Sequence, residues 1–230
     1  MEIQTVSEKL GCPAGVLRQD WLPGCGWPLF QRSDMFCINT DTALLGEYMT
    51  IRPADTVLDI GCNNGALMLY AARFHPRALI GIDKLAEACV LARENLRLNG
   101  VDNARVICAD VADFRQEEVD VIVCNPPYFP ALPQPADESS FLDAARHEQS
   151  CTLPVLFAAG GRLLKDKGRM YMVHRASRLA DIIVALHASP LKLRRLTPVY
   201  DRRRSQAKAV LMEIRKGGGG DVQLDDAVWI

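Results

Sequence analysis

From residue 56 onward, short apolar segments rich in β-branched residues alternate with amphipathic segments of helical periodicity. Such alternation is typical of a parallel β-sheet whose strands are joined by helices packed on both of its faces. The apolar segments are almost continuously hydrophobic, as strands buried on both faces are. The sequence therefore predicts an α/β fold with a mostly parallel sheet. The predicted strands are residues 56–60, 78–82, 105–108, 119–124, 169–173 and 207–214.

The segments between these strands carry the apolar spacing of helices. Apolar side chains recur at i, i+3, i+4 and i+7 between residues 67 and 74, and again between residues 179 and 186. This spacing places them along one face of a helix, where they can pack on the sheet. Further helices are expected over residues 41–49, 85–98 and 154–164.

The 230 residues fit one large α/β domain with short appendages. Residues 1–39 are rich in Gly, Pro and Cys, and we expect them to form an irregular N-terminal extension. Four consecutive glycines at 217–220 predict a flexible tail over residues 217–230, which leaves 40–216 as the main domain. Residues 126–147 contain five prolines and form a long connection, which we expect to be a loop facing the substrate.

Composition excludes several classes of protein. With 49% hydrophobic and 24% charged residues, the chain is not intrinsically disordered, collagen-like or a coiled coil. The longest uncharged stretch, residues 121–136, is too short and too rich in proline to span a membrane as a helix. Because the first residues also lack the pattern of a secretion signal, we expect a cytoplasmic protein with no membrane partner. Eight cysteines without a Cys-x-x-Cys pair predict no metal site.

The net charge of −1 conceals an uneven distribution of charge along the chain. Residues 1–150 carry a net charge of −9, whereas residues 151–230 carry +8. A basic C-terminal third is able to hold a polyanion such as nucleic acid, although solvated surface charge is an equally good interpretation. The densest basic positions are Arg194, Arg195, Arg202, Arg203 and Arg204.

The first predicted strand, which includes Asp59, runs directly into a turn that reads Gly61-Cys62-Asn63-Asn64-Gly65. In open α/β sheets, ligands bind at the carboxyl ends of the strands. Glycines at 61 and 65 remove Cβ atoms where a ligand approaches the backbone, and asparagine tolerates left-handed backbone angles. By itself, this pattern also fits a simple turn from a strand to a helix.

Two further acids follow the next two predicted strands. Asp83 ends the second strand, where a carboxylate can accept hydrogen bonds from both ribose hydroxyls of a nucleoside. Asp110 follows the third strand, where its carboxylate or the neighbouring backbone can meet an adenine amino group. Each acid alone fits an ordinary surface position, but the ordered set of glycine turn, Asp83 and Asp110 predicts a cofactor that contains a nucleoside.

The fourth predicted strand ends in Asn125-Pro126-Pro127-Tyr128, the most specific motif in the chain. A proline-rich turn is the structural alternative. Together with Asp-x-Gly-x-x-x-Gly at 59–65 and the acid at 83, this motif resembles the class I S-adenosylmethionine-dependent methyltransferases that modify planar amino or amide nitrogens. The resemblance implies a Rossmann-like fold with a seven-stranded sheet, whose last strand, over 207–214, is antiparallel. It also implies that 40–216 is the methyltransferase domain.

The motif suits this chemistry because an amine conjugated to a ring is a poor nucleophile. The Asn125 side-chain carbonyl and the Pro126 backbone carbonyl are able to accept its two N–H bonds, which leaves the lone pair aimed at the methyl group. The same oxygens then stabilise positive charge that develops on the nitrogen. Pro126 and Pro127 hold the backbone rigid, and Tyr128 is expected to stack on the flat substrate. The expected catalytic residues are therefore Asn125, Pro126, Pro127 and Tyr128.

Further segments are similar to the bacterial valine-tRNA adenine-N6 methyltransferase family. They are Leu22-Pro23-Gly24, residues 36–45, Asn125 to Phe129, Ala145-Arg146-His147-Glu148, and Val173-His174-Arg175 followed by Arg178-Leu179. Arg146, His147 and Glu148 also fit a charge cluster at the start of a helix. The chain departs from the family pattern at Asn63, where glycine is common, and at residues 224–227.

The resemblance implies S-adenosyl-L-methionine as the cofactor, with Thr40 and Asp41 near its methionine part. The full set of expected cofactor-binding residues is Thr40, Asp41, Asp59, Gly61, Cys62, Asn63, Gly65, Asp83, Lys84, Asp110, Val111 and Asn125.

The expected activity is N6-methylation of an adenine in tRNA, in the anticodon loop of a valine tRNA. Within the same class, DNA adenine, rRNA adenine and protein glutamine are alternative substrates. A nicotinamide-dependent oxidoreductase shares the glycine turn and the ribose acid, but its Gly-x-Gly-x-x-Gly pattern is missing here. A non-catalytic RNA-binding protein that keeps the fold is the third alternative. The sequence leaves open the oligomeric state and the roles of residues 1–20 and of the tail after Gly220.

Overall fold

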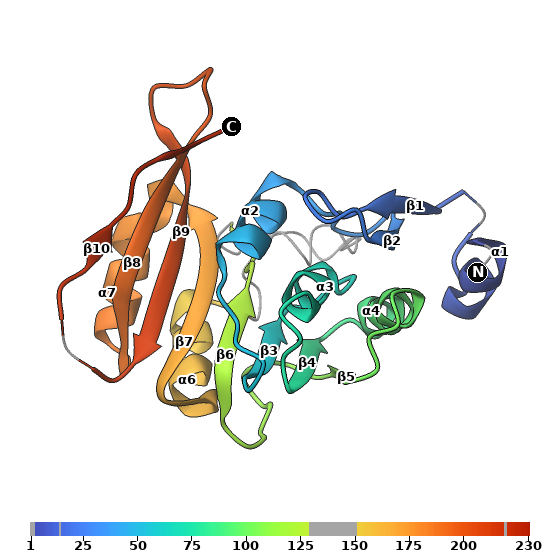
Figure 1. Cartoon of the computed structure of the whole chain (residues 1–230), viewed down its shortest axis with the longest axis horizontal. Helices are drawn as coiled ribbons and strands as arrows, with labels where there is room; N and C mark the ends of the chain where they lie inside the picture. The colour runs from blue at the N-terminus through green and yellow to red at the C-terminus, as the bar shows by residue number, and fades with distance from the viewer. Residues whose placement is uncertain (1–2, 14, 129–150, 219) are drawn as a thin grey trace, which may run out of the picture.

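A computed structural model describes residues 3–13, 15–128, 151–218 and 220–230. Within these residues, one sheet of nine strands is flanked by helices on both faces (Figure 1). The strands of this sheet are β3 (Thr56–Ile60), β4 (Ala78–Asp83), β5 (Ala104–Cys108), β6 (Val119–Cys124), β7 (Leu164–Arg175), β8 (Leu191–Tyr200), β9 (Ala207–Lys216), β10 (Gln223–Leu224) and β11 (Val228–Trp229). The helices are α1 (Ile3–Leu10), α2 (Thr40–Tyr48), α3 (Ala66–Ala72), α4 (Ala86–Leu98), α6 (Leu153–Leu163), the 3-10 turn η1 (Ala176–Arg178) and α7 (Leu179–His187).

Seven strands form the body of the sheet in the order β8-β9-β7-β6-β3-β4-β5. The strands from β5 across to β7 pair in parallel, whereas β9 pairs antiparallel with both β7 and β8. The predicted α/β fold, with a mostly parallel sheet and an antiparallel strand over 207–214, is confirmed. Because β8 runs in the same direction as β7, the carboxyl ends of β3, β4, β6, β7 and β8 all meet at one edge of the sheet.

The parallel strands are buried on both faces, as their apolar sequences predict. Along β3, Val57 faces a core shared with α3 and α4, whereas Leu58 and Ile60 face a second core shared with α6 and α7. These two cores hold the helices against opposite faces of the sheet and so position its carboxyl edge.

The segment predicted to be an irregular extension is partly regular. It contains α1 and a hairpin of β1 (Leu17–Trp21) and β2 (Pro28–Arg32), both packed against α4. Asn95 of α4, which is fully buried, accepts a hydrogen bond from Phe30 N at 2.6 Å and donates to Phe30 O at 2.9 Å. It also donates to Asn64 O at 2.8 Å, so the hairpin is tied to the glycine turn.

Strand β8 was not among the predicted strands. It contains Lys192, Arg194 and Arg195, and these charges obscure the apolar positions that the strand buries, such as Leu191 and Leu196. Arg195 lies 3.6 Å from a Glu213 carboxylate oxygen and 3.7 Å from one of Asp225, with its guanidinium 4.3 Å from the centre of the Tyr48 ring. Charge that was interpreted as a possible nucleic-acid surface therefore serves, at Arg195, to hold the sheet together.

The predicted flexible tail differs from the structure after Gly220. Strands β10 and β11 both pair in parallel with β8, Gln223 beside Arg195 and Val228 beside Val199. The Thr197 hydroxyl donates to the Asp225 carboxylate at 2.6 Å, which anchors the tail between the two short strands. These additions give the sheet nine strands in place of the predicted seven.

Across the parts of the chain that the structure describes, no helix is both long and apolar enough to cross a bilayer. In the same parts, no three His, Cys, Asp or Glu side chains converge as a metal site would require. All eight cysteines are free thiols.

Candidate active site

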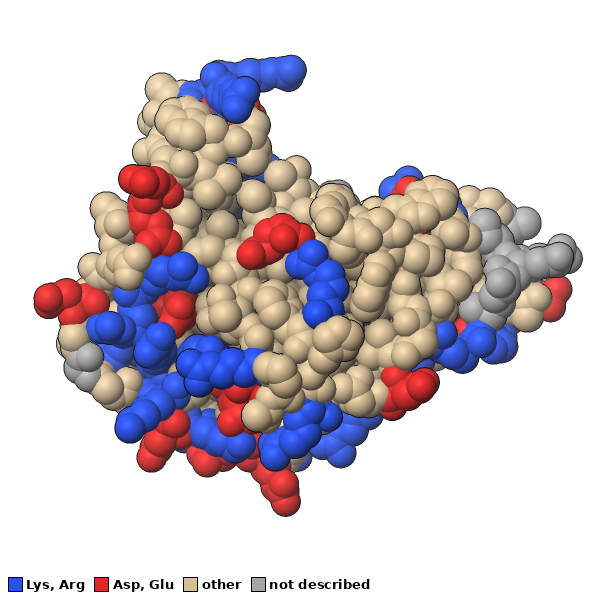
Figure 2. All heavy atoms as spheres, in the orientation of Figure 1, with Lys and Arg blue, Asp and Glu red and all other residues tan. Residues whose placement is uncertain are grey.

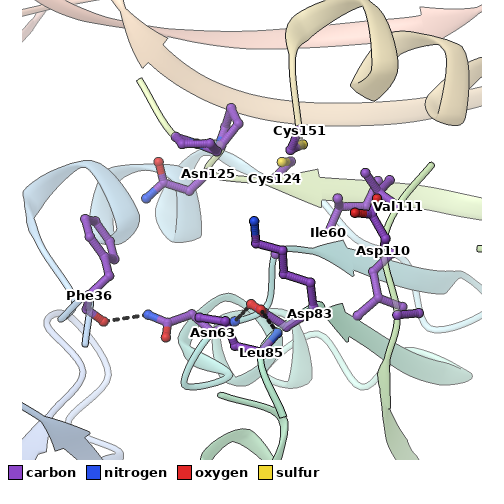
Figure 3. Close-up of a pocket in the computed structure, with 16 residues that line it drawn as sticks. Phe36, Ile60, Asn63, Asp83, Leu85, Asp110, Val111, Cys124, Asn125 and Cys151 are labelled. Carbon is purple, nitrogen blue, oxygen red and sulfur yellow. Dashed lines mark hydrogen bonds between the residues drawn. The ribbon is translucent and has the colours of Figure 1, made fainter. Parts of the chain in front are cut away.

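A cleft opens at the carboxyl ends of β3, β4 and β6, between the glycine turn and the Asn125 motif (Figure 3). It brings together predicted residues that lie far apart in the sequence. The predicted residues in its lining are Gly61, Asn63, Asp83, Lys84, Asp110, Val111, Asn125, Pro126 and Pro127. A smaller hollow adjoins the cleft, shares Gly61, Asn63 and Asn125 with it, and is also bordered by Asp59 and Cys62.

Four other predicted residues lie around the cleft rather than in its lining. Thr40 is exposed at the start of α2, and the neighbouring Asp41 is buried with Lys208 Nζ 3.4 Å from its carboxylate. Gly65 caps α3, and a Cβ there would lie 3.3 Å from Ala92 of α4. Gly65 therefore permits close packing of two helices. The fourth residue, Tyr128, contacts Asn125 through its hydroxyl.

The glycine turn leaves open space where a ligand can approach the backbone. Gly61 has a φ of +73°, and a Cβ added there would meet nothing within 4 Å. Asn63 also adopts a left-handed backbone, with φ of 45°, and its side-chain amide donates to Phe36 O. Asparagine tolerates this backbone region better than most residues, so it fills the position where glycine is common.

Asp83 is held rigidly by backbone donors from two sides. Its Oδ2 accepts from Asn63 N at 2.9 Å, and its Oδ1 accepts from Leu85 N at 3.0 Å, as Figure 3 shows. Burial raises the pKa of this carboxyl, although the backbone N–H groups oppose the shift. Each carboxylate oxygen has a second lone pair, so Asp83 retains the capacity to accept bonds from a diol in the cleft.

Asp59 is fully buried at the end of β3, beside the smaller hollow. Burial raises the pKa of its carboxyl well above the usual range, and the nearby Asp83 adds to the shift. Its Oδ1 has no hydrogen-bond partner among the described residues. A buried polar atom of this kind is costly unless something satisfies it, so Asp59 favours a polar ligand or water in the hollow.

The apolar part of the lining was missed in the sequence. Ile60 and Leu85 lie beside the acids, and Cys124 and Cys151 close the side near β6 (Figure 3). Ile82, which precedes Asp83 in β4, also lines the cleft. Ile60, Ile82 and Cys124 belong to the strand ends themselves, so the same alternation that located the acids contained the signal for them. Cys151 precedes α6 and had no such signal. Apolar side chains around Val111 suit the faces of a flat ring.

Asn125 is oriented by Thr42, a residue that we did not predict as part of the site. The Thr42 hydroxyl lies 3.2 Å from Asn39 Oδ1 and 3.0 Å from Asn125 Nδ2. Asn39 Oδ1 also accepts from Thr42 N as the cap of α2, so this atom is an acceptor. Thr42 must therefore donate its proton to Asn39 and accept from Asn125 Nδ2.

This arrangement directs Asn125 Oδ1 toward Tyr128, whose hydroxyl donates to it at 2.6 Å. Burial raises the pKa of the Tyr128 phenol well above its usual value, and Asp41 adds to the shift, so the hydroxyl keeps its proton. The Tyr128 ring lies 5.1 Å from that of His174 and 5.9 Å from the Arg175 guanidinium. Arg178 donates to Tyr128 O at 3.0 Å, which fixes the backbone after the two prolines.

The remaining predicted positions fall into two groups. Arg146, His147 and Glu148 lie outside the described residues, as do Phe129 and most of the long connection. Of the basic positions, Arg194 donates to Asp221 O at 3.0 Å, whereas Arg202, Arg203 and Arg204 are exposed in the turn between β8 and β9.

Comparison with known proteins gives one family match. Residues 28–186 match the methyltransferase small domain family. Similar curated proteins are named tRNA1(Val) (adenine(37)-N6)-methyltransferase. The protein from Dickeya chrysanthemi is 30% identical over 80% of this chain and 75% of its own length, and that from Porphyromonas gingivalis is 31% identical over 77% and 74%. The protein from Shewanella halifaxensis is 32% identical over 63% of this chain, and the match spans 61% of its length.

Solved structures share the fold at low sequence identity. The complex of TYW2 from M. jannaschii with AdoMet has a TM-score of 0.63 at 13% identity, covering 88% of this chain and 87% of that one. A ribosomal protein L11 methylase from Lactobacillus delbrueckii has a TM-score of 0.59 at 18% identity, covering 81% and 84%. These likenesses concern the Rossmann-like architecture.

Proposed function

The chain belongs to the methyltransferase small domain family, and from this premise we propose that it methylates N6 of an adenine in a valine tRNA. It is a methyltransferase whose cofactor is S-adenosyl-L-methionine. When bound, this cofactor supplies an electrophilic methyl group on a sulfonium. The chain's own task is to hold the cofactor and to orient a weakly nucleophilic nitrogen toward that group.

The cleft fits the cofactor at three points. The Asp83 carboxylate is fixed by Asn63 N and Leu85 N, and we assign to it the ribose hydroxyls. The open space at Gly61 admits the ligand against the backbone. Asp59 Oδ1, which has no hydrogen-bond partner in the described part of the chain, offers an acceptor to the polar methionine part, directly or through water. We assign adenine binding to the apolar walls beside Val111 and Asp110.

The observation that carries the proposal is the fixed direction of Asn125 Oδ1. Thr42 holds the amide so that this oxygen is an acceptor that receives an O–H from Tyr128 at 2.6 Å. We propose that the N6 amino group of the substrate takes the place of this hydroxyl and donates one N–H to Asn125 Oδ1. The Pro126 carbonyl accepts the second N–H. With both N–H bonds held, the nitrogen lone pair is directed into the cofactor cleft.

The same two oxygens favour the transition state over the ground state. Positive charge develops on the nitrogen as the new bond forms, and preorganised oxygen acceptors stabilise it without reorganising. The positive charge makes the nitrogen acidic, and it then releases one of its two protons to water. Once freed from Asn125, the Tyr128 ring is available to stack on the base. Pro126 and Pro127 keep the acceptors in place because their φ angles are fixed.

The substrate assignment comes from the relatives, each of which is named for adenine 37 of tRNA1(Val). A base in a loop is already partly unstacked, so moving it into a cleft costs less than the few kcal/mol that a duplex base requires. We propose that the exposed arginines at 202–204 contact the phosphates of the tRNA, and binding should then weaken as salt increases.

Mass spectrometry of nucleosides tests the proposal. Transfer RNA, DNA and protein pools are each incubated with the protein and methyl-labelled S-adenosylmethionine. The proposal predicts labelled N6-methyladenosine from tRNA, lost when the valine tRNA carries another base at position 37. Label in DNA or on glutamine instead would assign the same cleft to a different substrate, and transfer to none of the pools would contradict the proposal.

A further inference from the structure

The tail after Gly220 builds a surface that the methyl-transfer chemistry does not use. Strand β11 extends the sheet beside the carboxyl end of β8. Ile230 N donates to Tyr200 O at 2.9 Å, and Arg202 N donates to Ile230 O at 3.1 Å. These bonds tie residues 228–230 to the base of the turn that carries Arg202, Arg203 and Arg204.

Trp229 is the large apolar side chain on this surface. Its ring stacks on that of Tyr200, with centroids 4.9 Å apart and an interplanar angle of 25°. Although this contact braces the tail, 55% of Trp229 remains exposed. Burial is the main source of an aromatic ring's stabilising effect, and more than half of the surface of Trp229 does not contribute in this way. The exposed part of the ring is therefore available to a flat partner.

The adjacent turn is strongly basic. Arg202, Arg203 and Arg204 are all exposed, and Figure 2 shows Lys and Arg side chains at the tip of the projecting hairpin. Asp201, which directly precedes these arginines in the sequence, accepts from the backbone N–H of Arg203 at 3.0 Å. Three positive charges within three residues make a site for closely spaced negative charges.

The strand register places this surface on the same edge as the active site. Ala209 of β9 pairs with Arg175 of β7 on one side and with Val199 of β8 on the other. The next pairing, between β6 and β7, sets Cys124 beside Met172. Tyr200 thus lies in the row just beyond Arg175, and Asn125 lies three strands away, a lateral distance of roughly 14 Å at about 4.8 Å per strand.

We propose that Trp229 and the turn at 202–204 form a docking surface for the substrate RNA, with the arginines on its phosphates and the exposed indole stacked on an unpaired base. This proposal rests on the proposed function, because it names where the RNA outside the reacting adenine is held. The combination of an aromatic face with adjacent cations is the chemistry that recognises single-stranded nucleic acid. An acidic peptide would use the cations without needing the ring.

Binding of a fluorescent anticodon stem–loop RNA separates the two components of this surface. Trp229→Ala should raise the Kd for the RNA by about 5- to 100-fold, the usual effect of removing one base-stacking aromatic side chain. Trp229→Phe should recover most of that loss. Two variants serve as matched controls: Leu224→Ala, in the same tail with 71% exposure, and Trp21→Ala, on β1 with 60% exposure. Both should bind as the wild type does.

Salt dependence identifies the arginines. Replacing Arg202, Arg203 and Arg204 together with Gln should reduce the slope of log Kd against log salt concentration by about 2, since each contact to single-stranded phosphate contributes about 0.7. Trp229→Ala should leave the slope unchanged because stacking releases no counterions. Binding of S-adenosylmethionine should be the same in every variant, which shows that the main domain stays folded.

Methyl transfer to tRNA is measured on the same proteins, so the two proposals can fail separately. If the wild type methylates tRNA while Trp229→Ala and the arginine variant bind RNA as it does, the docking surface is overturned and the proposed function stands. If the wild type binds the RNA through these residues but transfers no methyl group to tRNA, the docking surface stands and the proposed function falls. An equal loss of binding in Leu224→Ala and Trp229→Ala would also overturn the docking surface, because it would reflect a detached tail.

Discussion

The two halves of the sheet's carboxyl edge are built in different ways. On the β3–β5 side, acidic side chains stand at or directly after strand ends, and backbone N–H groups hold Asp83. On the β8–β11 side, the charged residues lie on a long strand, a turn and a returning tail. In the first half, the position of each acid follows from where its own strand ends. In the second half, the role of each charged residue is set by the residues it contacts, which lie far away in the sequence.

Arginines of the second half show what this difference means. Arg195 lies beside Glu213 and Asp225 and covers the Tyr48 ring, whereas Arg203, eight residues later, is exposed. The two positions look alike in a count of charges. Burial and partners separate a side chain that stabilises the sheet from one that is available to a polyanion.

The largest expected effect is at Asn125, where the two halves meet. Asn125→Ala removes the oriented acceptor, and kcat should fall by about 100- to 1,000-fold, as when one donor of an oxyanion hole is lost. The KM for S-adenosylmethionine should change little. Asn103→Ala is the matched control, since the Asn103 amide bonds Pro76 O at 2.7 Å near the other end of the strands. Near-normal turnover in Asn125→Ala would remove the residue from its proposed role.

His174, on β7 between the two halves, should make the free energy of unfolding depend on pH. It is fully buried, and burial together with Arg178 lowers its pKa to about 4 from an ordinary 6.5. Between these values the unfolded chain binds the proton and the folded chain does not, so the free energy of unfolding decreases as pH falls through this window, by at most about 3 kcal/mol. Urea unfolding at several pH values measures it.

A variant isolates the contribution of this one side chain. His174→Asn should remove its share of the pH dependence between 6.5 and 4, whereas His187→Asn, at an exposed position on α7, should leave the profile of the wild type. Asp59 and Asp83 have raised pKa values and act in the opposite sense, so the comparison of variant with wild type is the informative quantity. Identical profiles for all three proteins would contradict the assignment.

Asp83 tests the cofactor half alone. Asp83→Asn keeps an oxygen for one backbone N–H but removes the charge, so affinity for S-adenosylmethionine should weaken by about 10- to 100-fold, the effect of losing a charged hydrogen bond. Calorimetric titration measures this Kd. Asp102→Asn is an exposed control on the same side of the sheet. Unchanged affinity in Asp83→Asn would mean that the ribose is held elsewhere.

Thr42 should give a smaller effect of a distinctive kind. Thr42→Val keeps the shape of the side chain but loses the bond to Asn125 Nδ2, so kcat should fall by about 3- to 15-fold, the value of one neutral hydrogen bond. Steady-state kinetics should show KM nearly constant and recovery in Thr42→Ser. A loss that serine does not recover would assign Thr42 to packing.

The smallest expected effects separate the two arginines. Arg195→Gln should lower the free energy of unfolding by about 1 kcal/mol, since its ion pairs are partly exposed, while RNA binding keeps the salt slope of the wild type. Arg203→Gln should leave unfolding unchanged and reduce that slope by about 0.7. Urea unfolding and RNA binding are measured on both variants. A reduced salt slope in Arg195→Gln, or a loss of stability in Arg203→Gln, would contradict the prediction.

The same comparison explains which parts of the fold and of the site could be predicted from the sequence. Asp59, Asp83 and Asp110 could be located because a parallel sheet brings strand ends together whatever the rest of the chain does. Thr42 could not, because its bond to Asn125 joins residues 83 positions apart. Strand β8 was missed because its charged residues are satisfied by Glu213 and by the tail, partners that are visible only once the chain is folded. The tail after Gly220 was predicted to be flexible because it follows glycines. Its pairing with β8 and the bond from Thr197 to Asp225 join residues that lie far apart in the sequence, so they too could not be predicted.

A crystal structure of the protein with S-adenosyl-L-homocysteine tests the central claim most directly. We predict the ribose hydroxyls on Asp83, the sulfur on the side of the cleft that Asn125 Oδ1 borders, and the bond from Asn125 Nδ2 to Thr42 retained. A cofactor bound away from the glycine turn, or an Asn125 amide that presents its nitrogen to the cleft, would contradict the account.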